Sequence, residues 1–159
     1  MIPIAEAAHD FLSCRRIAVT GVSRTPGNHG SNVVYDRLVE RGYEVFAVNP
    51  NATEAAGAPC YPTIAAIPGG VDAVVIGTAP SRALDAVKEA DQLGIRHVWM
   101  HRSIDAGSVS DEATAYGREH GIRVIDGGCP LMFDPAADGG HKFMCGLLTL
   151  FGRVPRRVE

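Results

Sequence analysis

The loop at residues 21–30, GVSRTPGNHG, holds the residue types best suited to binding a phosphate group. Gly21 lacks a Cβ atom, so the chain can turn tightly there and bring backbone N–H groups close to phosphate oxygens. Ser23 adds a hydroxyl donor, and Arg24 and His29 offer a cation nearby. A helix is expected directly after the loop, with the positive end of its dipole directed at the same place. The loop therefore predicts a ligand that carries phosphate.

The glycine spacing argues against a redox dinucleotide. A fingerprint for NAD needs GxGxxG and an acidic residue about 20 positions further on, which binds the ribose 2′-hydroxyl. Ser23 stands where the second glycine belongs, and the next apolar run ends in VNPN, residues 48–51, without a carboxylate. The GxxxxGK[ST] sequence of a P-loop is also missing. A protein that binds NAD or NADP remains an alternative.

Catalytic side chains are harder to identify. Cys129 follows two glycines and precedes a proline, but the sequence places no general base beside it, and packed thiols are more common than reactive ones. His101, His120 and His141 form neither HxxH nor HExxH. We therefore predict no catalytic residue and no metal site.

Alternating strands and helices must position these residues. Short β-branched or apolar runs predict five strands, and residues 4–13 predict an amphipathic helix. Three further helices are expected between the strands, with Ser31 and Ser110 as N-caps of two of them and Pro80 at the start of another. Residues 50–70 are expected to be mostly irregular. The predicted strands are residues 16–20, 43–48, 71–77, 95–100 and 122–125; the three further helices are 32–41, 80–93 and 111–120.

This order predicts an α/β fold, doubly wound, with a mostly parallel five-stranded sheet and helices on both faces. The strand at residues 71–77 is almost wholly apolar, as expected where helices cover both faces of a sheet. Ligands bind beyond the carboxyl ends of such strands, so all five strand ends are candidates for one site.

The bulk composition is that of a single globular domain. The chain has 159 residues, 21% of them charged, and a net charge of -3, which gives no reason to expect nucleic acid or an anionic membrane as a partner. The four cysteines match no zinc pattern and read as reduced thiols. With no signal peptide and no apolar run long enough for a membrane span, we expect a cytoplasmic protein.

Five stretches, taken in order, resemble the small stand-alone CoA-binding proteins and the CoA-binding domain of the succinyl-CoA synthetase α-subunit. The resemblance covers residues 15–130, the expected core, and implies a Rossmann-like domain; residues 131–159 form a C-terminal extension, expected to be helical and to pack on the domain or on a second subunit in a homodimer. The stretches are GVSR, GYEVFAVNPN, YPTIAAIPGGVDAVVIGTAP, LGIRHVWMH and GIRVIDGGCP.

The resemblance implies that coenzyme A or an acyl-CoA lies across the strand ends. It assigns phosphate contacts to the first loop, the border of the nucleotide to VNP, the path of the pantetheine arm to TAP, and the thiol end to the surroundings of Trp99, His101 and Cys129. The expected cofactor-binding residues are Gly21, Val22, Ser23, Arg24, Asn28, His29, Gly30, Val48, Asn49, Pro50, Thr78, Ala79, Pro80 and His101.

The function expected from this resemblance is CoA binding without catalysis. The synthetase works with a second domain that carries a phosphorylated histidine and with a nucleotide-binding subunit, and this chain is too short for either. The alternatives are an enzyme that acts on an acyl-CoA or a nucleotide through Cys129 or His101, and an interaction module whose glycine loop is structural.

Overall fold

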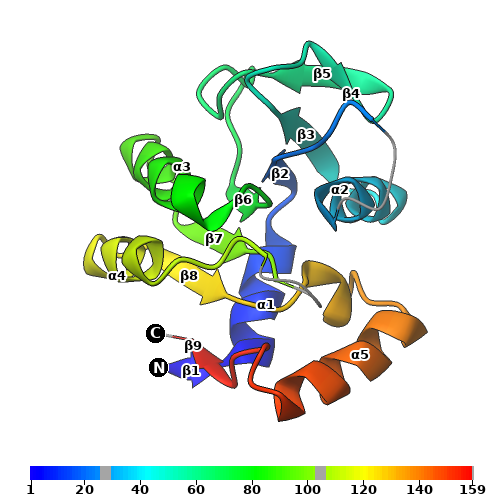
Figure 1. Cartoon of the computed structure of the whole chain (residues 1–159), viewed down its shortest axis with the longest axis vertical. Coiled ribbons are helices and arrows are strands. Elements are labelled where there is room, and N and C mark those ends of the chain that lie inside the picture. Colours follow the sequence, from blue (N-terminus) through cyan, green and yellow to red (C-terminus); the bar gives the residue numbers. More distant parts are fainter. Residues whose placement is uncertain (26–29, 103–106, 159) are drawn as a thin grey trace.

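A seven-stranded sheet with helices on both faces forms the centre of the molecule. The computed structural model describes residues 1–25, 30–102 and 107–158. In this part of the chain the strand order is β4-β5-β3-β2-β6-β7-β8. Helices α3 and α4 lie on one side of the sheet, and α1 and α2 on the other (Figure 1). Two clusters of buried apolar side chains follow the same division, so the sheet separates two cores.

The five predicted strands are present and parallel. Their neighbours are in continuous register, for example Val19 opposite Ala47 on one side and Val75 on the other. Helices cover both faces of these strands, which explains why their sequences are apolar rather than alternating. The strands are β2 (Arg16–Thr20), β3 (Glu44–Val48), β6 (Ala73–Ile76), β7 (His97–Met100) and β8 (Arg123–Asp126).

The predicted count of five strands is wrong, because the segment expected to be irregular extends the sheet. β5 (Ala58–Tyr61) pairs in parallel with β3, and β4 (Glu54–Ala55) pairs antiparallel with β5. The N–H of Asn49 donates to the carbonyl of Tyr61 at 2.9 Å and continues this ladder. Strands of two to four residues, one interrupted by Pro59, are too short to show a period in the sequence.

The predicted helices are confirmed, and one of the two predicted caps is wrong. The helices are α1 (Ile4–Ser13), α2 (Gly30–Glu40), α3 (Pro80–Gln92) and α4 (Asp111–Glu119). Ser110 caps α4 by accepting from the N–H of Ala113. Ser31, however, lies inside the first turn of α2, and its hydroxyl donates to the carbonyl of Gly77 at 3.1 Å. A tertiary partner therefore takes the hydroxyl that the sequence assigned to a local cap.

The C-terminal extension is helical only in part. The 3-10 turn η1 (Pro130–Met132) leads to α5 (Gly139–Leu150), and β9 (Arg157–Val158) then pairs antiparallel with β1 (Ile2–Pro3). The two ends of the chain lie side by side (Figure 1). None of the helices in the described ranges is long and apolar enough to cross a membrane.

Candidate functional site

The strand order reverses at β2, and this reversal creates a crevice. β2 lies between β3, the next strand along the chain on one side, and β6 on the other. Connections that leave toward opposite sides open a crevice beyond the carboxyl ends of the strands, where ligands bind in this class of sheet. The described part of the loop after β2, residues 21–25, and the first turn of α2 lie at this edge of the sheet.

Gly21 is required by packing inside this edge. Its φ of 77° suits glycine, and a Cβ atom there would lie 2.7 Å from the carbonyl oxygen of Gly77. The N–H of Gly21 donates to the carbonyl of Val48 at 3.0 Å. The N–H of Gly21, which was predicted to approach a phosphate, therefore donates within the protein. The close approach of β2, β3 and β6 explains why residue 21 is a glycine.

Gly77 fixes the start of α2 against the end of β6. Its N–H donates to Thr20 Oγ1 at 3.1 Å, and its carbonyl accepts from Ser31 Oγ at 3.1 Å. A Cβ atom on Gly77 would lie only 2.0 Å from Ser31 Oγ. The bond from Ser31 therefore holds the first turn of α2 against the end of β6, and the short distance leaves no room for a side chain at residue 77.

Two asparagine side chains hold the loop after β2. Asn32 is buried; its Oδ1 accepts from the N–H of Ser23 at 2.8 Å, and its Nδ2 donates to the Ser23 carbonyl at 2.9 Å. Asn49 Nδ2 donates to the carbonyl of Val22 at 2.9 Å. Asn49 is one of the residues predicted at the site from the sequence, whereas Asn32 is not. The sequence signal that could have identified Asn32 is a polar residue on the inward face of the second predicted helix.

Arg24 projects from this clamped loop into an open cavity. The cavity measures about 570 Å³, and Arg24 makes no hydrogen bond or ion pair with any residue of the described ranges. One carboxylate, Glu54 of β4, shares the cavity, and the sequence analysis did not anticipate it because β4 itself was not predicted. The lining residues are Arg24, Pro50, Asn51, Ala52, Thr53, Glu54, Cys60 and Pro62.

The start of α3 and the end of β7 complete the edge. Ala79 is the N-cap of α3 and Pro80 occupies its first turn, while Thr78 Oγ1 is buried without a hydrogen-bond partner in the described part of the chain. His101 is 8% exposed and lies against the start of α2, because a Cβ atom on Gly30 would come within 2.9 Å of its Cε1. The predicted residues Asn28 and His29 lie outside the described residues.

Trp99 and Cys129 lie in the core and do not face the crevice, contrary to what the resemblance implied. The Trp99 indole N–H donates to the carbonyl of Gly127 at 2.9 Å, and its ring packs edge-on against Phe11. Cys129 is 3% exposed, and burial raises the pKa of its thiol to about 12. A thiol that stays protonated is a poor nucleophile. No cluster of metal-binding side chains occurs in residues 1–25, 30–102 or 107–158.

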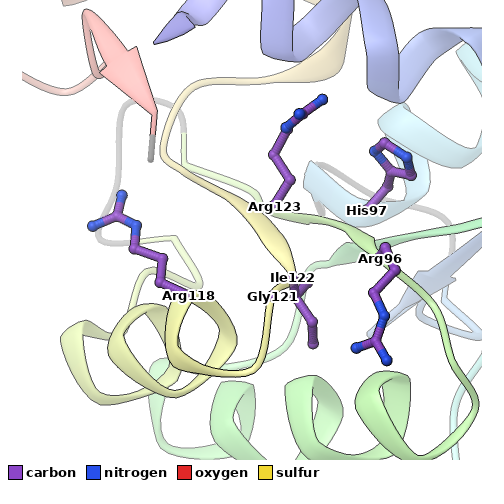
Figure 2. Close-up of a pocket in the computed structure, with 6 residues that line it drawn as sticks. All are labelled: Arg96, His97, Arg118, Gly121, Ile122 and Arg123. Carbon is purple, nitrogen blue, oxygen red and sulfur yellow. The ribbon is translucent and has the colours of Figure 1, made fainter. Parts of the chain in front are cut away.

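A second hollow, of about 520 Å³, lies at the amino ends of β7 and β8 (Figure 2). Arg123 and His97 extend in one direction there and Arg96 in the other, while Arg118 lies apart on α4 (Figure 2). Each of the three guanidinium groups contacts a carboxylate. Arg123 contacts Asp10, Arg96 contacts Asp91, and Arg118 contacts Asp126.

The histidine in this hollow adds little positive charge. Burial, followed by the neighbouring Arg123, lowers the pKa of His97. Each arginine already contacts a carboxylate, and the arginine side chains point in different directions. This hollow is therefore not arranged to bind an anion.

Comparison with known proteins gives matches over most of the chain. A family model described as "CoA binding domain" matches residues 15–135. The acetate–CoA ligase [ADP-forming] II of Archaeoglobus fulgidus is 29% identical over 155 residues, which is 92% of this chain and 22% of that protein. YneT, an uncharacterized protein of Bacillus subtilis, is 29% identical over 76% of this chain and 86% of its own length.

Solved structures agree with these sequence matches. A hypothetical protein from Pyrococcus horikoshii OT3 superposes with a TM-score of 0.69 at 29% identity, over 78% of this chain and 87% of that one. The apo dinucleotide-forming acetyl-coenzyme A synthetase 1 of Ca. Korarchaeum cryptofilum gives 0.57 at 26% identity, over 73% of this chain and 26% of that one. The chain therefore spans about a fifth of the length of the ligase it matches in sequence.

Proposed function

The chain belongs to the CoA binding domain family, and from this premise we propose that it binds coenzyme A or an acyl-CoA at the carboxyl edge of its sheet. The observation that carries the proposal is the cavity beside the strand reversal, which Arg24 enters without an internal counter-ion in the described part of the chain. Coenzyme A carries a pyrophosphate and a 3′-phosphate, so it needs cations and hydrogen-bond donors at this place.

The parts of the cofactor divide along the edge. We assign the nucleotide to the cavity bordered by Pro50 and Asn51, and its phosphates to Arg24, Ser23 and the N-terminus of α2, since a helix N-terminus and a cation both favour negative charge. The pantetheine arm runs past Thr78, whose buried hydroxyl has no hydrogen-bond partner in the described ranges and would gain one from an amide of the arm.

The proposed role is binding without catalysis. The acetate–CoA ligase to which the chain is similar is more than four times as long, so its ligase reaction is not assigned to this domain. An enzyme that uses Cys129 is disfavoured because the thiol is buried and its pKa is raised to about 12. His101 lies at the start of α2 and fits the cofactor-binding set instead.

Isothermal titration of the purified chain with CoA tests the proposal. We expect Arg24→Ala to weaken binding about tenfold or more, since a hydrogen bond to a charged group contributes roughly 1.5–3 kcal/mol. Arg156→Ala is the matched control, because Arg156 is also exposed and lies beside β9, far from the crevice. Equal binding by the two variants would reject the assignment of the phosphates to Arg24.

A ligand series tests the identity of the cofactor. We expect CoA to bind more tightly than dephospho-CoA, ADP and NADH, because only CoA combines the 3′-phosphate with the pantetheine arm. Tighter binding of NADH, together with its loss in Glu54→Gln, would favour the dinucleotide alternative, since Glu54 is the carboxylate in the cavity.

A further inference from the structure

The C-terminal helix α5 exposes an apolar face that the described chain leaves uncovered. Phe143, Leu147, Leu150 and the following Phe151 are 78%, 46%, 77% and 71% exposed, whereas Leu148 is the one residue of α5 that is buried. At 100° per residue, the four exposed side chains fall within an arc of about 100°, the width of an apolar stripe that faces a core. The stripe therefore has the pattern of a buried surface.

The rest of the described chain does not cover this stripe. After Phe151 the chain turns back, and its end pairs with β1 on the far side of α1 (Figure 1). A hollow of about 640 Å³ runs along α5 and is lined by Gly140, Phe143, Met144, Leu147, Leu148, Phe151 and Arg153. All of α5 also lies beyond residues 15–135, which the family model matches.

We propose that α5 is the interface of a homodimer, in which the helix packs antiparallel against α5 of a second copy. A twofold axis at Leu147 places Phe143 of each copy beside Phe151 of the other, since these residues stand four positions on either side of it. The three residues form one i, i+4, i+8 ridge, and such ridges interdigitate at a crossing angle of about −50°. The face is thus complementary to itself.

The exposed area fits a dimer of this size. With roughly 200 Å² for a fully exposed aromatic side chain, the two phenylalanines and two leucines offer on the order of 450 Å² per copy. Two copies therefore bury about 900 Å² from these side chains, which is close to the ~1,000 Å² that a biological interface should clear. A patch of this extent on a monomer is often functional.

The chemistry of α5 fits a protein partner better than a lipid surface. Interfacial membrane helices carry many lysines and arginines on their polar face, whereas Lys142 is the one such residue in α5, and it pairs with Asp134 at 2.8 Å.

Sedimentation velocity of the full chain over a concentration series tests the dimer. We expect a species of about twice 16.8 kDa for the native chain, and a monomer for Leu147→Glu, which places two carboxylates at the axis. Leu93→Glu is the matched control, since Leu93 is 45% exposed on the other face of the sheet, and it is expected to remain dimeric. Phe143→Glu provides a second disrupting variant at a position so exposed that folding of the monomer is spared.

Three outcomes would overturn the proposal. The first is a native chain that stays monomeric, whether or not it co-sediments with anionic vesicles. The second is a dimer that persists in both Leu147→Glu and Phe143→Glu, and the third is a dimer that Leu93→Glu also dissociates. Titration with CoA tests binding at the crevice separately. The two α5 variants are expected to bind CoA as the native chain does.

Discussion

The two hollows at opposite edges of the sheet are similar in size and both contain arginine, yet their charges are arranged differently. The hollow at the amino ends of β7 and β8 measures about 520 Å³ and contains three arginines, each in contact with a carboxylate. The cavity at the carboxyl edge measures about 570 Å³ and contains Arg24, which meets no carboxylate among the described residues.

This difference shows that the number of cations does not identify an anion site. An arginine that already has an internal carboxylate gains little from a phosphate, because binding the phosphate means giving up the existing partner. The amino-edge hollow therefore reads as a set of ion pairs that join α1, α3 and α4 to the sheet, and the carboxyl edge as a place for a ligand.

The largest expected effect comes from the glycine that joins the strands at the carboxyl edge. Gly21→Ala should lower the free energy of unfolding by about 3 kcal/mol, since the new Cβ meets the Gly77 carbonyl and the residue keeps a positive φ. Gly42→Ala shares the positive φ but has open space, so about 1 kcal/mol is expected. Urea unfolding measures both, and equal losses would contradict the packing role of Gly21.

The second effect concerns Cys129, which is buried just after β8, in contrast to the open crevice. Because the pKa of Cys129 is raised from 9.0 to about 12, its contribution to stability is complete below pH 9 and is lost as the pH rises toward 12. Near pH 10 the loss should reach about 1 kcal/mol. Urea unfolding at a series of pH values measures it, and Cys129→Ala should flatten the decline. A decline of the same depth in that variant would assign it to other groups.

The third prediction compares an arginine from each hollow. Arg24→Ala should weaken CoA binding about tenfold and leave stability within about 0.5 kcal/mol, because the side chain is exposed. Arg123→Ala should do the reverse, with CoA affinity unchanged and stability lower by up to about 1 kcal/mol, as its ion pair with Asp10 is partly exposed. Calorimetry measures the CoA affinity of both variants, and urea unfolding measures their stability. If both variants changed affinity and stability in the same way, the two hollows would not differ as described.

The smallest expected effect concerns the carboxylate in the carboxyl-edge cavity. Glu54→Gln removes a negative charge beside the proposed phosphates, so CoA should bind about twofold more tightly at low ionic strength. Added salt should reduce the gain, because the groups are open to solvent. Titrations at two salt concentrations measure it. A weaker complex at low salt would mean that Glu54 binds the ligand directly.

The amino-acid sequence was sufficient for the parallel core. Apolar runs such as β6 and β7, bounded by helical patterns with clear caps and stops, predict a doubly wound sheet because a strand covered on both faces must be apolar throughout. The strand ends, and with them the loop that carries Arg24, follow from that topology. Helical structure was also expected in the extension at residues 131–159, and α5 occupies part of it.

Contacts between distant segments decided the rest, and no local pattern encodes them. β5 forms because β3, a separate segment of the chain, supplies its hydrogen bonds, and Ser31 leaves its predicted cap for the carbonyl of Gly77, 46 residues away. Burial of Cys129 and the carboxylate partners of the amino-edge arginines likewise depend on the packed chain. Solvent exclusion and ion pairing belong to the environment that folding creates, so only the tertiary structure separates the open crevice from the neutralised hollow.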